Sequence, residues 1–554
     1  MIERLNANWR SWQEESLRPF SIPLFRALWF AALAAHFGAA IQAVGASWTM
    51  TVLAPSPHMV ALVSTAAMLP IVILALPAGA LADTMDRGSL MLASQILGAC
   101  AAATLAVLSF TNHVTPLVLL ALTTAVGASV ALHQPAWQAS IGDLVPRTDV
   151  PAAVSLNVLA FNTARSVGPA LGGLVLAVTS PSVAFLLNAV SCAGLIAVLT
   201  MRRLPRVERR HPPERIVAAM AAGLRFVSMS PQLKRIFLRG STFGFGASAL
   251  LSLLPLLARA RLNGGPMAYG AMMGAVGLGS FVGALLAMRV RSTIGGNRIL
   301  GLAIVVYSLV AFGVAYSRQL WLSIPLVAIA GLAWIFVLTT TRTAVQLCSP
   351  RWVVGRTVAL GQVAGFGCMA LGSAIWGAIG SAIGIPSALA LSGAFLLVSV
   401  ALHRIAPLPS IEEAEVTGSP AKIPAPRVAI DQDTGPVVIS IEYTVRADDA
   451  KEFLTLMMEL GRMRRRNGAA QWSLRQDIDN PDLWIEQIES QTWLDHVRRL
   501  DRYTAADRKL AAQVASLRAK AERAVQRTVI RRAGSSPLVE RAEVGGSLAS
   551  EHPP

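Results

Sequence analysis

The sequence predicts an all-α polytopic membrane protein with twelve transmembrane helices in two six-helix halves, followed by a small C-terminal α+β domain with a ferredoxin-like pattern. Its 554 residues are 54% hydrophobic and only 14% charged, with a mean hydropathy of +0.54, whereas soluble domains carry about 25% charged residues. Acidic residues are missing from the whole stretch between Glu214 and Glu412. These observations exclude a single globular domain, a disordered chain and a secreted disulfide scaffold.

The apolar segments define the expected helices, since about 20 apolar residues cross a hydrocarbon core roughly 30 Å thick. Twelve stretches are long enough. They cover approximately residues 25–49, 58–81, 88–110, 115–136, 153–178, 182–201, 237–258, 267–289, 297–316, 319–342, 357–380 and 384–403.

The basic residues predict the orientation of these helices. The connection 202–236 is rich in arginine, so the positive-inside rule places it and both termini in the cytoplasm, with the helices in the cell (inner) membrane. The first apolar run is long enough to stay as a helix, and no cleaved signal peptide is expected. The net charge of +17 lies in loops and tail, where it faces anionic lipid rather than nucleic acid.

The expected domains follow from this pattern. A cytoplasmic segment 1–22 precedes the N-terminal half 23–201, the basic loop 202–236 and the C-terminal half 237–404. A proline-rich linker 405–436 leads to a soluble domain 437–533 and a disordered tail 534–554. Within the soluble domain a strand from Val437, a helix through Arg466, strands near 470–476 and 483–488 and a helix from about Gln491 give a βαββα order. Val529 and Ile530 can add a last strand.

An internal repeat links the two halves. Pro146 and Arg147 recur 204 residues later as Pro350 and Arg351, and in both copies a glycine follows 22 positions after the proline. Chance matching between low-complexity helices explains shared Val, Leu and Ala residues, but not this consecutive Pro-Arg pair. We therefore expect two homologous halves with a substrate site between them.

The loop after the second expected helix carries a charged motif. Gly79, Asp83 and Arg87 match the signature of the major facilitator superfamily, which the sequence resembles here, although Thr84 stands where many members have arginine. The resemblance implies that the glycine lets two helices approach closely and that the charges stabilise the outward-facing state. Alternatively, Asp83 is only a helix cap.

The fifth expected helix carries a second cluster. Its glycines permit close helix contact, and Pro169 can kink the helix. The cluster consists of Asn162, Arg165, Gly168, Pro169, Gly172 and Gly173. With Phe25-Arg26 and the Leu69-Pro70 to Gly79 run, it resembles the transmembrane secretion effector branch that contains enterobactin exporters. The resemblance implies a secondary active transporter of the plasma membrane, most simply a proton-driven antiporter that exports a siderophore or drug-like molecule by alternating access.

Polar residues within the apolar segments are the candidate substrate or proton sites, because such groups are costly in a membrane. Besides Arg165, they are His36, Gln42, His133, Gln134, Arg342 and Gln346. As no Asp or Glu lies deep in a segment, His36 is the best proton carrier, or else it forms a hydrogen bond between helices. Arg165 and Arg342 favour an anionic or catecholate-like substrate, although Arg165 can instead bind its neighbouring loop.

The soluble domain resembles a different family. Glu489-Ser490, Trp493, His496, Arg499, Arg502, Thr504 and Asp507 are similar to a stretch of domains related to antibiotic-biosynthesis monooxygenases. Such domains pair through their sheets, which implies a homodimer. A regulatory or dimerising module is favoured over an enzyme, and we expect no cofactor, metal or catalytic residue. The four cysteines lie in or beside apolar segments and predict no disulfide.

Two rival functions fit the same sequence. A membrane-tethered oxidative enzyme would need only one span, so twelve argue against it. An importer of a small nutrient differs from an exporter only in the direction of flux, which the sequence does not record.

The charged motif generates a first prediction. We expect Asp83→Asn to slow transport without preventing folding, because the residue biases the equilibrium between inward-facing and outward-facing states. The measurement is the transport rate of purified, monodisperse protein. A variant that transports at the unmutated rate would leave only a helix-capping role.

Overall fold

The computed structural model describes residues 17–146, 148–202, 216–262, 264–350, 352–408, 428, 430–517 and 525–530. Most of the expected linker, the tail 534–554 and much of the expected cytoplasmic segment 1–22 and basic loop 202–236 lie outside the described residues. The chain divides into two compact units. We call residues 1–218, 232–345 and 358–409 the helical unit, and residues 219–231, 346–357 and 410–554 the second unit.

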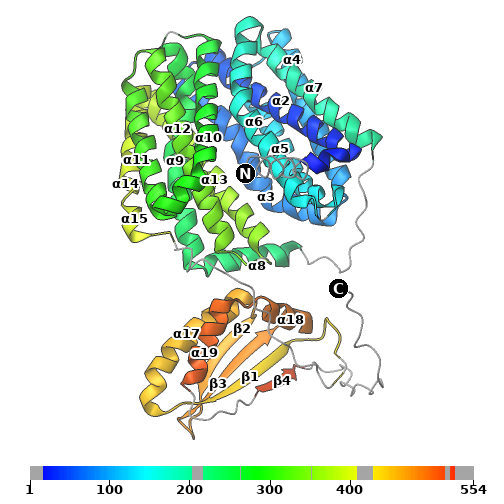
Figure 1. The fold of residues 1–554 in the computed structure, drawn as a ribbon, viewed down its shortest axis with the longest axis vertical. Coiled ribbons are helices and arrows are strands. Elements are labelled where there is room, and N and C mark those ends of the chain that lie inside the picture. The colour runs from blue at the N-terminus through cyan, green and yellow to red at the C-terminus, as the bar shows by residue number, and fades with distance from the viewer. Residues whose placement is uncertain are drawn as a thin grey trace, which may run out of the picture. The chain divides into compact units, whose positions relative to one another are not determined.

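The first half of the helical unit consists of a short 3-10 helix and six long helices (Figure 1). They are η1 (Arg18–Ser21), α2 (Pro23–Leu53), α3 (Pro57–Thr84), α4 (Arg87–Phe110), α5 (Pro116–Leu144), α6 (Val150–Val178) and α7 (Pro181–Met201). Prolines stand in the first turn of several of these helices, where their missing N–H is not needed.

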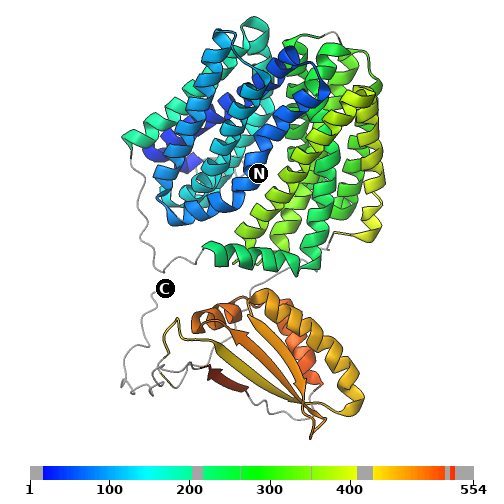
Figure 2. The same ribbon diagram turned by 180° about the vertical axis from the view of Figure 1, so that it is seen from behind.

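The second half repeats this arrangement. It comprises α9 (Pro231–Ala260), α10 (Pro266–Ile294), α11 (Gly296–Tyr316), α12 (Leu320–Leu347), α13 (Val354–Ile383), α14 (Ile385–Ser399) and the short α15 (Leu402–Ile405). Helix α8 (Ile216–Ser228) lies within the expected basic loop, and α9 begins at Pro231 rather than near 237. Figures 1 and 2 show the two halves side by side, the first in blue and cyan and the second in green and yellow.

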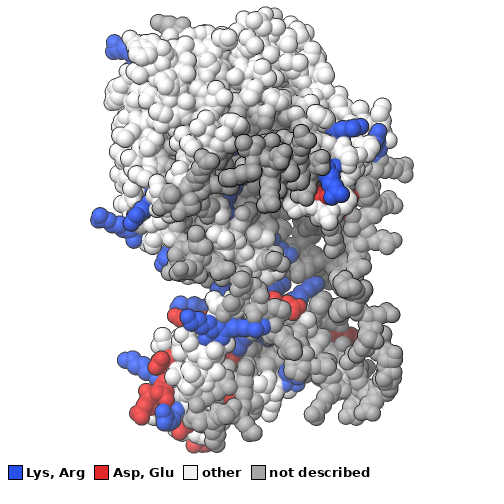
Figure 3. All heavy atoms as spheres, viewed as in Figure 1, with Lys and Arg blue, Asp and Glu red and all other residues white. Residues whose placement is uncertain are grey.

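Helices occupy all twelve expected positions, and the structure supports ten of them as spans by length and composition. Among the described residues ten helices are long and apolar enough to cross a membrane. The other two are α6, whose apolar run is interrupted by Asn157, Asn162 and Arg165, and α14, which has 15 residues. On the face of the helical unit seen in Figure 3, the described atoms between its margins are almost all uncharged, as a multi-pass membrane protein requires.

The repeat is visible in the helix boundaries. Helices α12, α13 and α14 begin at Leu320, Val354 and Ile385, each 204 residues after the first residue of α5, α6 and α7. This is the offset at which the Pro-Arg pair recurs. The structure thus agrees with two homologous halves.

Glycines bring the halves together along α6 and α10. A Cβ built on Gly173 would lie 2.2 Å from the Cα of Gly270, and one built on Gly277 would lie 2.3 Å from the carbonyl oxygen of Ser166. A second contact between the halves joins α3 to α13, where the Thr65 hydroxyl donates to the Ala370 carbonyl at 2.9 Å. Any residue larger than glycine at 173 must therefore separate α6 from α10.

This contact generates a second prediction. We expect Gly173→Leu to disturb the α6–α10 contact, with a cost of about 1–3 kcal/mol for overpacking, and to slow transport. The matched control is Gly194→Leu on α7, where a Cβ meets nothing within 4 Å. Thermal unfolding and transport of both purified variants provide the comparison. Equal behaviour of the two would show that the close approach is dispensable.

The second unit contains a four-stranded antiparallel sheet. Its strands are β1 (Val437–Thr444), β2 (Gln471–Gln476), β3 (Leu483–Ser490) and β4 (Val525–Val529), in the order β2-β3-β1-β4. The helices are α17 (Ala450–Asn467), α18 (Trp493–Asp501) and α19 (Ala505–Ser516), after the short 3-10 helix η2 (Ala447–Asp449). The predicted βαββα order is confirmed, and β4 includes Val529. The expected second helix is two helices, because Thr504 and Asp507 form a capping box that starts α19.

We call the part of the second unit from Val437 to Val529 the sheet domain. A charged network fills its interior. Glu486, which is 0% exposed, accepts hydrogen bonds from Tyr443 at 2.7 Å, Trp472 at 3.0 Å and Arg464 at 3.1 Å. Burial alone would raise the pKa of Glu486, but the Arg464 guanidinium and these hydrogen bonds hold it below its usual value. Because its pKa is lower in the folded domain than in the unfolded chain, protonation of Glu486 destabilises the domain.

His496 is the pH-sensitive group of this domain. Its Nδ1 lies 2.9 Å from an Arg499 nitrogen, and burial together with the neighbouring charges of Arg499 and Arg527 lowers the pKa of His496 to about 4. An unfolded chain protonates this histidine below about pH 6.5, while the folded domain keeps it neutral. The unfolded state therefore binds more protons between about pH 6.5 and 4.

The third prediction follows from this difference. The free energy of unfolding of the sheet domain should fall by roughly 3 kcal/mol as the pH drops from about 6.5 to 4, and His496→Gln should remove most of that fall. Hydrogen exchange of the α18 amides in the full-length protein measures it. An unchanged pH dependence in His496→Gln would show that other groups cause the acid sensitivity.

Candidate functional site

A cavity of about 370 Å³ lies within the helical unit. Both halves contribute to it: Phe161 and Arg165 come from α6, and Trp334 and Arg342 come from α12. Further walls come from α9 and α13, with Phe243 and Gln362 among them. We call this space the arginine cavity. Its size is typical of a site for a small organic molecule.

Helix geometry places these side chains together. Phe161 precedes Arg165 by four residues and Trp334 precedes Arg342 by eight, so each pair lies on one side of its helix. The Arg165 Cζ is 5.8 Å from the centre of the Trp334 ring, within the range of a cation–π contact. This contact joins the two halves across the cavity.

The charge of the arginine cavity is one-sided. Among the described residues that line it none is acidic, whereas Arg165 and Arg342 both keep their charge in any protein environment. Two guanidinium groups in a membrane interior gain most from an anion that both can bind. The aromatic walls favour a flat apolar body attached to that anion.

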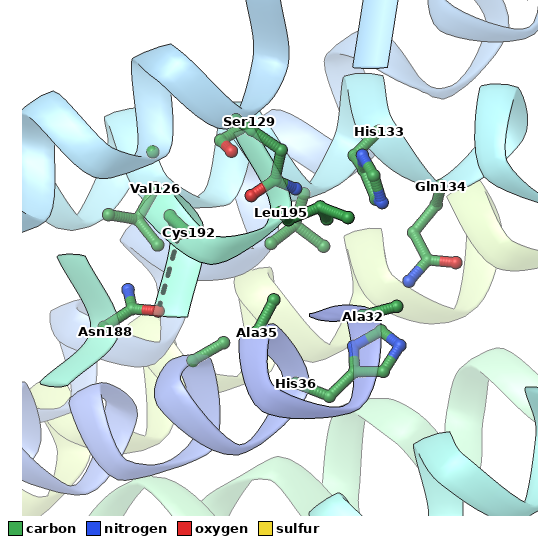
Figure 4. A pocket seen from close by; sticks show the side chains of 14 residues that line it. Ala32, Ala35, His36, Val126, Ser129, His133, Gln134, Asn188, Cys192 and Leu195 are labelled. Carbon is green, nitrogen blue, oxygen red and sulfur yellow. Dashed lines mark hydrogen bonds between the residues drawn. The ribbon is translucent and has the colours of Figure 1, made fainter. Parts of the chain in front are cut away.

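A second, smaller cavity of about 50 Å³ lies inside the first half (Figure 4). Helices α2, α4, α5 and α7 line it, and polar side chains face it from each of them. These are His36, Gln95, Ser129, His133, Gln134, Asn188 and Cys192. We call this space the histidine chamber. Figure 4 shows His36 and His133 on opposite sides, with Gln134 beside them.

The structure brings together some of the predicted site residues and leaves others apart. Arg165 and Arg342 share the arginine cavity, and the histidine chamber collects His36, His133 and Gln134. Gln42 lines neither space. It accepts a hydrogen bond from the Asn188 amide at 2.5 Å. Asn162 and Gln346 also line neither.

The glycines of the fifth-helix cluster pack against α2 and α10. A Cβ on Gly168 would lie 2.6 Å from the Cβ of Ala40, and one on Gly172 would lie 3.2 Å from the Cα of Ile41. Gly173 meets Gly270 on α10. Pro169, which follows Gly168 in the sequence, is buried within α6. These residues hold in place the helix from which Arg165 lines the cavity, one turn before the proline.

The charged motif between α3 and α4 differs from its expected arrangement. Arg87 donates to the carboxylate of Asp143 and, at 2.9 Å, to the carbonyl of Ala139. Helix α5 runs to Leu144 rather than 136, which is why the sequence did not suggest Asp143 as the partner. Asp86, not Asp83, caps α4, with Ser89 N–H at 2.8 Å. The Asp83 side chain lies outside the described residues, and a Cβ on Gly79 would meet nothing within 4 Å.

Sequence reasoning missed the aromatic lining of the arginine cavity and one glutamine in each cavity, Gln362 and Gln95. Gln95 and Gln362 satisfy the same rule as the other candidates, as polar residues in apolar segments, and could have been found by it. Trp334 and Phe243 carried no such signal, since large aromatic residues are common in apolar helices.

Two homologous halves of six helices with a central cavity define the class of secondary transporters that work by alternating access. The chain belongs to the transmembrane secretion effector family of the major facilitator type, whose family model matches residues 14–536. It is therefore a transporter of the membrane, and no comparison shows an enzymatic activity.

Named relatives are similar at low identity. The chain is 24% identical to the staphyloferrin A transporter of Staphylococcus aureus over 285 residues, which are 50% of this chain and 70% of that protein. It is 26% identical to the multidrug efflux pump Tap of Mycolicibacterium fortuitum over 403 residues, 71% of this chain and 97% of that one. The enterobactin exporter EntS of Salmonella typhi is 26% identical over 299 residues, which are 52% of this chain and 71% of that protein.

Solved structures show the same fold. A bacterial homologue of the lysosomal transporter Spinster, inward-facing and unoccupied, aligns with a TM-score of 0.55 at 16% identity over 72% of this chain and 97% of that one. The nucleoside transporter NupG aligns with a TM-score of 0.52 at 15% identity, over 69% of this chain and 98% of that one. At these identities the likeness concerns the fold alone.

Proposed function

We propose that the protein exports a small organic anion, of siderophore or drug-like character, by alternating access between its two halves. The observation that carries this proposal is the arginine cavity: Arg165 and Arg342 face it from different halves, and the lining residues that the structure describes include no acidic one. An anion bound by both guanidinium groups would draw the halves together around it. Loss of that anion would leave two like charges, which favours reopening.

The chemistry of the walls narrows the substrate further. Arginine binds carboxylates and catecholates through paired hydrogen bonds, and Trp334, Phe161 and Phe243 offer aromatic surface on the same cavity. The relatives' names support this reading, since they describe a staphyloferrin A transporter, an enterobactin exporter and a multidrug efflux pump. Export is favoured over import by two of these three names.

The proposed arrangement in the membrane has twelve spans with both termini in the cytoplasm. The twelve helices at the expected positions and the arginines of the sixth connection support it. A cysteine introduced at Asp479 in a cysteine-free background should resist an impermeant thiol reagent in intact cells. Labelling of this cysteine in intact cells would show that the C-terminal part of the chain faces the outside, and would contradict the proposed topology.

Protons are the proposed coupling ion, in antiport with the substrate. No Asp or Glu occurs between residues 214 and 412, and the carboxylate of Asp143 is paired with Arg87 near the end of α5. His36 is the titratable side chain that faces the histidine chamber and also touches the wall of the arginine cavity. It is therefore the proposed point of proton coupling.

The sheet domain is proposed to regulate or dimerise the transporter rather than to act as an enzyme. The buried Glu486 carboxylate binds other side chains of the domain, Tyr443, Arg464 and Trp472, and is therefore not free to act on a substrate. Within the second unit, the Arg502 guanidinium lies 4.3 Å from the centre of the Trp352 ring, and Trp352 belongs to the segment between α12 and α13. That link offers a route from the domain to the transport helices. Pairing through the sheet is the proposed mode of a homodimer.

The fourth prediction tests the arginine cavity. We expect Arg165→Gln and Arg342→Gln each to weaken binding of a catecholate or carboxylate by about 10–100-fold, the cost of losing a charged hydrogen bond. Arg318→Gln, an exposed arginine of the loop before α12, is the matched control. Tryptophan fluorescence of purified protein, with Trp334 as a reporter in the cavity, follows the titration.

Two outcomes would contradict the proposed substrate class. One is unchanged anion binding in both cavity variants with the control also unchanged. The other is stronger binding of organic cations than of anions to the unmutated protein, because two uncompensated arginines repel a cation.

A further inference from the structure

The histidine chamber is too small for an organic substrate but large enough for water. A cavity needs about 10–15 Å³ of this kind of volume to hold one water, and polar partners must surround that water. The chamber measures about 50 Å³ and has polar side chains on all four of its helices. Size and lining therefore favour a few ordered waters.

Two side chains in the chamber wall need such partners. Nδ1 of His133 and Oε1 of Gln95 have no hydrogen-bond partner in the part of the chain that the structure describes, although these residues are only 5% and 6% exposed. Their neighbours are satisfied: the Ser129 hydroxyl donates to the Ser94 carbonyl at 2.7 Å, and the Asn188 amide donates to Gln42. A buried polar atom left unpaired is costly, and a water in the adjoining chamber would remove this cost for both.

We propose that the histidine chamber is a water-filled proton-binding site, in which His133 and His36 take up and release the coupling proton and Gln95 positions the bridging water. This proposal rests on proton-coupled export and assigns its site. It extends the role of His36 to a pair of histidines on two helices, α2 and α5.

The proton balance of the site is simple. A proton that enters through the chamber water adds to the basic nitrogen of one neutral imidazole, so the chamber gains a single positive charge. The resulting imidazolium later returns that proton to water, and the chamber is neutral again. Among the described lining residues the titratable groups are His36 from α2, His133 from α5 and Cys192 from α7, while α4 contributes only neutral Gln95 and Gly98. With no carboxylate among the described lining residues, a positive charge on one histidine disfavours a second charge in the same chamber, since like charges repel. The site therefore carries one proton at a time.

The chamber is connected to the arginine cavity through one aromatic ring. His36 packs edge to face against Phe161, with ring centres 5.5 Å apart. Phe161 also lines the arginine cavity, one helical turn before Arg165. Movement of the His36 ring on proton binding displaces a wall of the substrate cavity, and an anion in that cavity acts back on His36 by the same contact.

The experiment uses the full-length protein in proteoliposomes with 2,3-dihydroxybenzoate as a catecholate probe. Proton flux and probe flux are measured together for the unmutated protein and for His133→Gln, His36→Gln and Gln95→Leu. The matched control is His113→Gln, an exposed histidine in the turn between α4 and α5. We expect each chamber variant to lower the protons moved per probe molecule roughly tenfold, while downhill probe exchange stays within about twofold.

A second measurement detects the water. Hydroxyl radicals generated by X-ray pulses label side chains next to bound water, so we expect Cys192 to be labelled strongly in the unmutated protein. Val130→Phe, which fills the chamber, should suppress this labelling and uncouple proton flux. The labelling remains informative if a histidine variant fails to fold.

The outcomes separate this proposal from the proposed function. Normal proton coupling in His133→Gln and Gln95→Leu, or a chamber without labelling at Cys192, overturns the proton site but leaves anion export in place. Probe exchange without any proton flux in the unmutated protein also overturns it. No probe exchange in the unmutated protein counts against the proposed substrate class, and labelling of Cys192 then still decides whether the chamber is hydrated.

Discussion

Two guanidinium groups that share one membrane cavity, with no acidic residue among its described lining, are the constraint around which the helical unit is organised. Arg165 and Arg342 come from different halves, from α6 and from α12, which is the counterpart of α5 in the repeat. A charge in the bilayer interior persists only where something compensates it. Here the Trp334 ring provides part of that compensation for Arg165. In the proposed function an anionic substrate provides the remainder, and the cost of burying the arginines would then be recovered as affinity for that anion.

The helices that carry these arginines are held by small residues rather than by polar bonds. Gly168, Gly172 and Gly173 let α6 contact α2 on one side and α10 on the other. In lipid, where apolar side chains gain nothing by leaving the solvent, such close backbone contact is the main source of helix association. It also suits movement, because a smooth glycine interface can slide or rock without breaking hydrogen bonds. Helix α6 therefore carries both Arg165 of the cavity and the glycine contacts at which the halves can move in the proposed mechanism.

The two units treat charge in opposite ways. In the sheet domain the Glu486 carboxylate is compensated by the Arg464 guanidinium and by hydrogen bonds that Tyr443 and Trp472 donate to it, and Asp507 pairs with Arg466. Figure 3 shows acidic side chains gathered on this domain. The helical unit instead leaves arginine and histidine groups facing cavities. A charge compensated within the fold stabilises it, whereas an uncompensated charge in a cavity is available for a ligand or a proton.

The sequence alone determined the elements and their repetition. Apolar length, arginine-rich connections and the Pro-Arg pair are local properties, and the helices, the order of strands along the chain and the 204-residue offset followed from them. The candidate residues were also found by a local rule, polarity within an apolar segment. Only the tertiary structure decided which of them meet: Arg165 with Arg342, His36 with His133, and Arg87 with Asp143. The reason is that a membrane helix is apolar on every side, so its sequence has no polar face from which to infer its rotation or its neighbours. Those are set by packing between helices, by glycine contacts above all, and the pairing of distant side chains follows from that packing.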